Sequence, residues 1–309
     1  MANTNLDTDT NIEREDINNG GEMKFQPLEE YRIKELPEAA YYIPNFLTPA
    51  ESATLLAAIA KQPWTTLTHR RLQPHPAPLT PAGHLLTTKA LPPFLKPVID
   101  RLLELSFADT VDEPTTAGDG HTNHPISATI PLNDQHTNLT TKSTKWRGIF
   151  TSSPHGAPNH VLINEYPPGT GISPHEDGGA YYPVVCTVSL GSHTVLEITP
   201  KTSHTSSTNE HSNVEESTGG YRIFQEPLSL LITTGSLYTS HLHGIAPVKV
   251  DENLTAATVV NWPLLAEGTR REIEGGGGVV QRREVRVSLT CRDVLKVRDA
   301  GWVFGGKRR

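Results

Sequence analysis

The chain has 309 residues, enough for one large domain or two ordinary ones with a buried core. Residues 1–30 account for −6 of the net charge of −7, so the remaining chain is nearly neutral and lacks the global basic field that dominates non-specific nucleic-acid binding. No apolar run reaches the roughly 20 residues of a membrane span, which excludes a membrane-embedded class.

Residues 1–23 are polar and acidic, and we expect a disordered tail there. The tail does not resemble a signal or transit peptide, and Cys186 and Cys291 sit in apolar runs typical of reduced core cysteines. We therefore expect an intracellular protein, located in the nucleus and cytoplasm, with no membrane partner and a monomeric state.

Residues 24–107 predict a mainly helical N-terminal segment that begins with a strand at YYIPNF. Thr48, Pro49 and Glu51 indicate a helix cap, a first-turn proline and an early acid. Apolar residues at helical spacing follow the cap. A second helix is predicted at PPFLKPVIDRLLELS, with an apolar stripe of Val98, Leu102, Leu103 and Leu105.

Three stretches lack periodicity and are rich in polar residues and glycine. Residues 108–157 are predicted to be a low-complexity insertion, and shorter polar insertions are expected at 201–220 and near 264–283, the last as a loop. Between them lie short β-type runs such as HVLINEY, PVVCTVSL, TVLEIT, SLLITTGSLYTS and VRVSLTCRDV. This pattern favours a mainly β protein, an antiparallel sandwich or barrel.

The stretch PHEDGGAYYP places His175 and Asp177 two residues apart, so in extended backbone their side chains share a face. A third ligand has to come from elsewhere, and the stretch YTSHLHGIAP offers His241 and His243. Two histidines and one carboxylate on one face of a metal are typical of non-haem Fe(II) oxygenases. The alternative is ordinary surface polarity, because a short His-x-Asp pair is weak evidence alone.

The run RVSLTCRDV alternates polar and apolar residues. Arg286, Ser288, Thr290 and Arg292 share one face. If that face is interior, it needs an anionic partner, and arginine suits a bidentate grip on a carboxylate. The alternative is an edge strand with solvated arginines.

The segments NHVLINEYPPGTGISPHEDGGAYYPVVCTVSLGSHTVLEI, SHLHGIAP and RVSLTCR together resemble the AlkB-type Fe(II)/2-oxoglutarate dioxygenases, most closely the branch of the sixth AlkB homologue of eukaryotes. The resemblance is weaker over 41–73 and does not cover the tail or the insertions. It implies a double-stranded β-helix (jelly-roll) core over 158–309 with flanking N-terminal helices. It also implies the cofactors Fe(II), 2-oxoglutarate and O2.

Position by position, the resemblance implies an iron site of His175, Asp177 and His243, the histidine before Gly-Ile. Asn164 and Tyr166 match the pair that hydrogen-bonds 2-oxoglutarate. Arg286 matches the arginine of its distal carboxylate, and Arg292 a second arginine near the metal. The 43 residues from His243 to Arg286 exceed the spacing of compact bacterial members.

The resemblance also implies a lid over the target base within 24–107. Candidate substrate residues are Trp64, Arg70, Arg71, Gln73, Tyr181 and Tyr182. The expected reaction is oxidative demethylation of an N-alkylated base in single-stranded or locally unpaired nucleic acid, releasing formaldehyde. Two alternatives stay open: a protein hydroxylase or demethylase on the same scaffold, and a nucleic-acid-binding module with little turnover.

Overall fold

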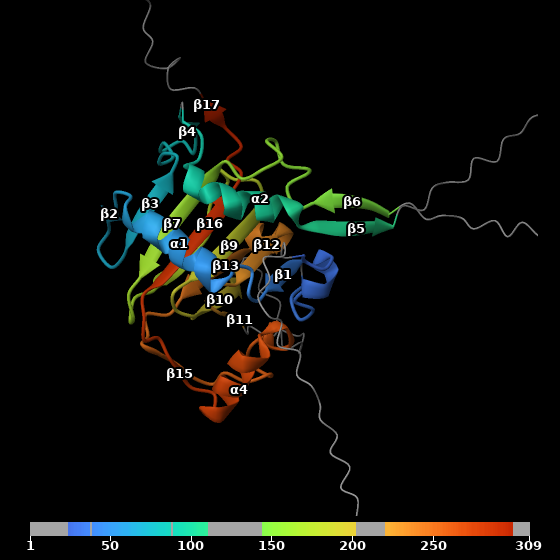
Figure 1. Cartoon of the computed structure of the whole chain (residues 1–309), viewed down its shortest axis with the longest axis vertical. Helices are drawn as coiled ribbons and strands as arrows, with labels where there is room; N and C mark the ends of the chain where they lie inside the picture. The colour runs from blue at the N-terminus through green and yellow to red at the C-terminus, as the bar shows by residue number, and fades with distance from the viewer. Residues whose placement is uncertain (1–23, 38, 88, 111–143, 202–219, 299–309) are drawn as a thin grey trace, which may run out of the picture.

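The computed structural model of the chain describes residues 24–37, 39–87, 89–110, 144–201 and 220–298. The predicted acidic tail and most of two predicted insertions lie outside these ranges. Two antiparallel sheets face each other, one of seven strands and one of four (Figure 1). The strand order is β1-β12-β9-β16-β7-β3-β2 in the large sheet and β11-β10-β13-β8 in the small one. The predicted double-stranded β-helix is confirmed.

The strands of the large sheet are β1 (Ala40–Ile43), β2 (Thr65–Thr66), β3 (Arg71–His75), β7 (His160–Tyr166), β9 (Val184–Leu190), β12 (Leu230–Thr234) and β16 (Arg286–Arg292). Those of the small sheet are β8 (Ile172–His175), β10 (Thr194–Pro200), β11 (Tyr221–Gln225) and β13 (His241–Ile245). Three two-stranded pairs flank them: β4 (Leu85–Leu86) with β17 (Val297–Arg298), β5 (Ser106–Thr110) with β6 (Thr144–Gly148), and β14 (Val250–Asp251) with β15 (Val280–Gln281).

Helices α1 (Pro49–Ala60) and α2 (Lys96–Glu104) pack on the outer face of the large sheet (Figure 1). They share one apolar core with alternate residues of the central strands, among them Val188 of β9 and Leu289 of β16. The opposite residues of the same strands face the small sheet. Because side chains alternate along a strand, one face of β16 builds this core and the other is free to line a site.

The predicted caps and apolar stripes are mostly confirmed. Thr48 caps α1 in a capping box with Glu51, and Leu55 and Ile59 are buried on its inner side. Val98 and Leu102 of α2 are buried as expected. The prediction for Leu103 was wrong: it was expected in the apolar stripe, but it is 42% exposed. Its position lies one residue past Leu102 and therefore turns away from the sheet.

Several expected boundaries need correction. The N-terminal segment is less helical than predicted, since besides the expected first strand, β1, it supplies β2 and β3 to the large sheet. The insertion predicted at 108–157 is shorter than expected, because β6 and the buried Phe150 belong to the folded body. The predicted loop near 264–283 contains helix α4 (Glu267–Gly275), held by the buried Ile273. The run SLLITTGSLYTS is β12 followed by the short helix α3 (Gly235–Thr239).

Three short 3-10 helices complete the described elements: η1 (Leu28–Tyr31), η2 (Pro93–Leu95) and η3 (Trp262–Leu264). Cys186 and Cys291 are buried and free, as predicted, and lie opposite each other on β9 and β16. Within the described ranges, every helix is too short or too polar to cross a membrane.

Candidate metal and cosubstrate site

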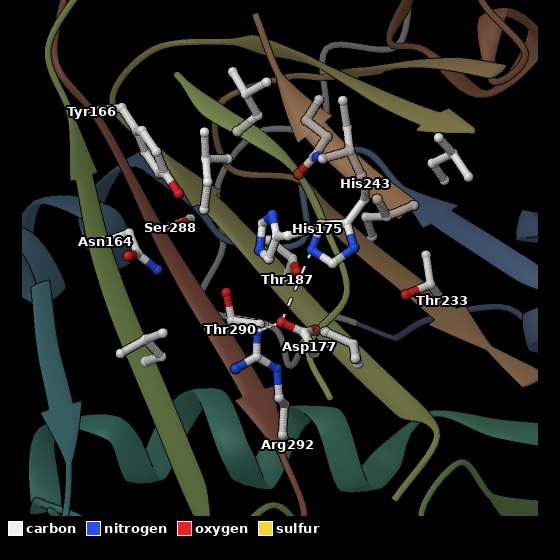
Figure 2. A pocket seen from close by; sticks show the side chains of 18 of the residues that line it. Asn164, Tyr166, His175, Asp177, Thr187, Thr233, His243, Ser288, Thr290 and Arg292 are labelled. Carbon is white, nitrogen blue, oxygen red and sulfur yellow. Dashed lines mark hydrogen bonds and ion pairs between the residues drawn. The ribbon is translucent and has the colours of Figure 1, made fainter. Parts of the chain in front are cut away.

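A cavity of about 850 Å³ opens between the two sheets. Its walls come from β7, β9, β12 and β16 on one side and from β8, β10 and β13 on the other. Polar side chains gather on this inner surface, with Asn164 and Tyr166 on β7 and Ser288, Thr290 and Arg292 on β16 all turned toward it (Figure 2). The face of β16 predicted to need an anionic partner is therefore interior.

His175, Asp177 and His243 come together in this cavity. One ligand atom from each lies within 4.8 Å of the others, and this group of three is the one in the described part of the chain with spacing suited to a metal ion. Antiparallel pairing of β8 with β13 sets His175 opposite His243, with ring centroids 4.4 Å apart. Asp177 follows β8 by two residues, and its carboxylate lies 4.0 Å from Nε2 of His243.

A hydrogen bond prepares the imidazole of His175 for a metal, and burial prepares that of His243. Nδ1 of His175 lies 2.8 Å from the carbonyl oxygen of Ser173, so Nδ1–H donates and Nε2 is left with a lone pair. Burial lowers the pKa of His243, against the opposing effect of Asp177. A neutral imidazole is the form that binds metals. His241, the alternative ligand, instead contacts the carbonyl oxygen of Ser236 through Nδ1, 3.0 Å away.

Arg292 holds the carboxylate of this group. Its Nη2 donates a 2.6 Å hydrogen bond to Oδ1 of Asp177, and both side chains are more than 90% buried. The guanidinium also lies over the ring of Tyr181, 4.7 Å from its centroid. Arg292 thus neutralises and orients the one carboxylate of the group, which agrees with its predicted place near the metal.

Asn164 and Tyr166 lie two residues apart on β7 and face the cavity together, as their spacing predicts. Pairing of β7 with β16 puts Asn164 beside Ser288 and Tyr166 beside Arg286. The Arg286 guanidinium stands 5.6 Å from the centroid of the Tyr166 ring. Asn164, Tyr166 and Ser288 form a polar wall on one flank of the metal group in Figure 2.

Arg286 is a buried cation with neutral partners. Its Nη2 donates to Ser189 Oγ at 2.9 Å and Gln225 Oε1 at 3.1 Å, while its Nε has no partner within the described residues. Burial lowers its pKa to about 10, so the side chain is still charged at neutral pH. Desolvating an unpaired guanidinium costs several kcal/mol. An anion in the cavity would remove that cost.

The residues present fit an Fe(II) ion with 2-oxoglutarate. Two imidazoles and one carboxylate on one side of an ion leave the other side open for a chelating cosubstrate. Arg286, with its orphaned Nε, and Tyr166 line the same cavity and offer the charge and hydrogen bonds that the distal carboxylate of 2-oxoglutarate would need.

The predicted substrate residues separate into two groups. Arg70 lines the cavity, and its Nε lies 3.4 Å from Oδ1 of Asn164. Arg71 points to the other face of the sheet, where it makes two 2.7 Å hydrogen bonds to Glu165 and covers the Trp64 ring at 4.5 Å. Trp64 also packs against the outer core. Trp64 and Arg71 therefore do not line the cavity, and their part in a lid over the target base stays a prediction.

The other candidates do not line the cavity. Tyr182 packs against the outer core, and Gln73 is buried and donates to the carbonyl of Ile59. Tyr181 lies beneath Arg292 and beside the His160 ring. Glu176, beside the ligands in sequence, is half-exposed and pairs with Lys201.

Sequence reasoning missed three cavity residues and one buried partner of Arg286. Thr187 faces the cavity and Ser189, two residues on along β9, accepts a hydrogen bond from Arg286, so the period of two is a signal that could have revealed them. Gln225 reaches Arg286 from β11, and Tyr238 of α3 donates a hydrogen bond to the carbonyl of Gly178. Neither has a local signal, because each arrives through long-range packing.

Comparison with known proteins agrees with this geometry. Residues 39–292 match the family described as the 2OG-Fe(II) oxygenase superfamily. The chain is 33% identical over 283 residues to "Probable RNA/DNA demethylase ALKBH6" of Danio rerio, covering 91% of this chain and 96% of that protein. It is 24% identical over 220 residues to "Alkylated DNA repair protein ALKBH8 homolog" of Arabidopsis thaliana, covering 69% of this chain and 52% of that protein.

Among solved structures, OsALKBH1 aligns over 88% of this chain and 99% of its own, with 13% identity and a TM-score of 0.38. The family match and the full-length relative define the classification. The chain belongs to the 2OG-Fe(II) oxygenase superfamily, as an AlkB-type dioxygenase that uses Fe(II), 2-oxoglutarate and O2.

Proposed function

We propose that this dioxygenase removes alkyl groups from the bases of single-stranded or locally unpaired nucleic acid. The observation that carries the proposal is the identity of 33% that extends over nearly the whole length of both chains to a protein described as a probable RNA/DNA demethylase. A cation at the cavity, Arg70, gives this substrate class a contact.

The proposed roles follow from the geometry. His175, Asp177 and His243 hold iron, and Arg292 keeps the carboxylate of Asp177 in place. Arg286 and Tyr166 receive the distal carboxylate of 2-oxoglutarate. Asn164 orients the cosubstrate from the same strand. Together, iron, 2-oxoglutarate and O2 supply the oxidant that hydroxylates the N-alkyl carbon, whose product releases an aldehyde.

Access to the site favours an unpaired base. A base must leave its stack to bring an alkyl group to a metal inside the fold, which costs a few kcal/mol and costs least in single strands. A groove of about 1430 Å³ adjoins the cavity, and the two share the side chains of Ile172 and Ile245. Gly169, Gly171 and Gly244 line it, so backbone is accessible there to a flanking nucleotide.

Formaldehyde release tests the proposal directly. Iron-loaded protein is incubated with 2-oxoglutarate and either N-methylated single-stranded oligonucleotides, the same oligonucleotides in duplexes, or a methylated peptide pool. We expect turnover with the single strands and less with the duplexes. Turnover with the peptides alone would replace this proposal with a protein demethylase or hydroxylase.

Arg70→Ala and Arg71→Ala form a matched pair of variants. Arg70 lines the cavity, whereas Arg71 is engaged by Glu165 on the other face of the sheet. We expect Arg70→Ala to weaken binding to all sequences alike and to lower the salt slope by roughly one unit, with Arg71→Ala close to the parent. Equal effects of the two variants would remove Arg70 from the substrate site.

We also propose that the protein acts as a monomer in the nucleus and cytoplasm. The proposed nucleic-acid substrate supports the location. Light scattering of the purified protein and microscopy of a tagged chain test the two statements separately.

A further inference from the structure

A buried ion cluster lies behind the wall that carries Arg286. Arg282 donates two 2.6 Å hydrogen bonds to the two carboxylate oxygens of Asp251, and Nε2 of His193 lies 3.1 Å from one of them. All three side chains are less than 10% exposed. Burial raises the pKa of Asp251, but the hydrogen bonds from Arg282 and His193 outweigh it and hold the pKa below its usual value.

The cluster joins three segments that are distant in sequence. His193 belongs to the turn between β9 and β10, Asp251 to β14, and Arg282 to the chain that returns from β15. A third bond from Arg282, from Nη1 to the carbonyl of Ala246 at 3.0 Å, ties this chain to the end of β13. His193 is further fixed by stacking on Phe224, with 5.0 Å between ring centroids.

The tie lies where the long insertion between β13 and β16 re-enters the sheet. Figure 1 shows α4 and β15 projecting from the body of the molecule. Arg282 is four residues before Arg286, the first residue of β16. The chain between them passes so close to Gly191 that an added Cβ there would lie 2.2 Å from the carbonyl of Val285. The path into β16 therefore has little freedom while Arg282 is held.

A small cavity connects the cluster to the site. It has about 220 Å³ of empty space, and both His193 and Arg282 line it. Arg286 and Tyr166 line it too, and both also line the large cavity. Arg286 thus borders both the cosubstrate space and the small cavity that two members of the cluster line.

We propose that Arg282, Asp251 and His193 form a clamp that positions Arg286 for 2-oxoglutarate. This inference rests on the assignment of Arg286 as the cosubstrate arginine. Asp251 pairs with Arg282 and neutralises its charge, whereas Arg286 has neutral partners. The positive charge of Arg286 therefore stays available to the ligand. The three are positioning residues, because none of them lines the large cavity.

The test measures 2-oxoglutarate binding by calorimetry on protein loaded with Mn(II) in place of iron, so that no turnover occurs. We expect Arg282→Gln to weaken binding about tenfold or more, as loss of an outer support does at ligand sites. Arg282→Lys keeps the positive charge but loses the planar guanidinium that donates two hydrogen bonds to Asp251. An intermediate loss of 2-oxoglutarate affinity is therefore expected. Mn(II) affinity should stay at the parental value, because the metal ligands are held separately.

Arg222→Gln is the matched control. Arg222 also ties backbone carbonyls near β14, those of Glu252 and Asn253, but it does not touch Arg282 or Ala246. We expect it to lower the melting temperature without changing the affinity for 2-oxoglutarate. If Arg222→Gln and Arg282→Gln weaken the ligand equally, or if folded Arg282→Gln binds like the parent, the clamp is refuted.

Two further variants keep the outcomes distinct. If Arg282→Gln does not fold, His193→Ala decides, with a smaller loss of affinity expected and parental affinity counting against the clamp. Arg286→Ala reports on the assignment beneath the inference. Should it bind 2-oxoglutarate like the parent, the assignment itself fails, whereas loss in Arg286→Ala with none in Arg282→Gln refutes the clamp alone.

Discussion

Arg292, the last residue of β16, donates a 2.6 Å hydrogen bond to Asp177 just beyond β8, so the large sheet supports a metal ligand presented by the small one. The pair is buried on both sides. A carboxylate that is neutralised and oriented before the metal arrives loses little freedom on binding it.

Replacing Arg292 with Gln should therefore weaken metal binding by about 10- to 100-fold, because Asp177 would lose both its counter-charge and its orientation. Mn(II) titration by calorimetry measures this. Arg71→Gln, which opens an exposed ion pair instead, serves as the control and should bind Mn(II) like the parent. Parental affinity in Arg292→Gln would show that Asp177 needs no support.

Iron content should depend on His243 and not on His241. His243 contributes to the group of three, whereas His241 contacts the backbone of Ser236. We expect His243→Ala to lose iron and His241→Ala to retain it, as determined by metal analysis after anaerobic loading. The reverse result would mean that β13 presents its other histidine to the metal.

Replacing Arg286 should weaken 2-oxoglutarate binding without destabilising the ligand-free protein. Arg286→Met is expected to weaken 2-oxoglutarate by at least about a hundredfold, since a buried carboxylate left without its partner costs about 3–5 kcal/mol. Without ligand, the variant should melt at the parental temperature or above, because the removed charge has only neutral partners. A clear fall in melting temperature would contradict this reading of the burial.

The contribution of Glu51 to stability should disappear in acid. The hydrogen bond from Arg101 lowers the pKa of Glu51 to about 2 from a model-peptide value of 4.5. A carboxyl whose pKa is lower in the folded than in the unfolded protein stabilises the fold at any pH above its unfolded-state pKa. That stabilisation is lost as the pH falls through the folded-state pKa. Glu51→Gln should thus melt below the parent at pH 7, and the gap should close between pH 4.5 and 2. A gap that persists at pH 2 would point to the cap geometry instead.

Shortening the chain should be tolerated only within limits that the fold defines. The polar composition of 1–23 and 111–143 predicts that removing either leaves the melting temperature unchanged. Residues 144–157 differ, since Phe150 is 1% exposed in the outer core. Phe150→Ala should cost about 3–5 kcal/mol in the free energy of unfolding, measured by denaturant titration.

The sequence predicted the site better than its surroundings. Alternation in RVSLTCRDV predicted the polar face of β16, and the spacing of His175 and Asp177 predicted that their side chains share a face, because strand period is a local property. The choice of His243 came from family resemblance. Gln225 and the Arg282–Asp251 pair could not be predicted, since they depend on contacts between residues 31 to 61 positions apart.

Helix α4 and the sheet face of Trp64 and Arg71 could not be read from the sequence for the same kind of physical reason. Helix α4 has one buried residue, Ile273, in a polar stretch ending in glycines, so it has no apolar stripe to read. Trp64 and Arg71 have the chemistry of a base-binding pair. Which face of the sheet they occupy is decided by the pairing of Arg71 with Glu165 of β7, which no local pattern reports.

The two-sidedness of β16 has a consequence for how faithfully the chain folds. A shift of its pairing by one residue would turn Arg286 and Arg292 into the packing beneath α1 and α2, and would turn Val287, Leu289 and Cys291 into the cavity. Two buried charges would lose their hydrogen-bond partners at once, so the misaligned sheet is strongly disfavoured. The arginines proposed to serve the active site therefore also help to fix the register of β16. The same residues that would bind the cosubstrate favour the strand pairing that assembles the site.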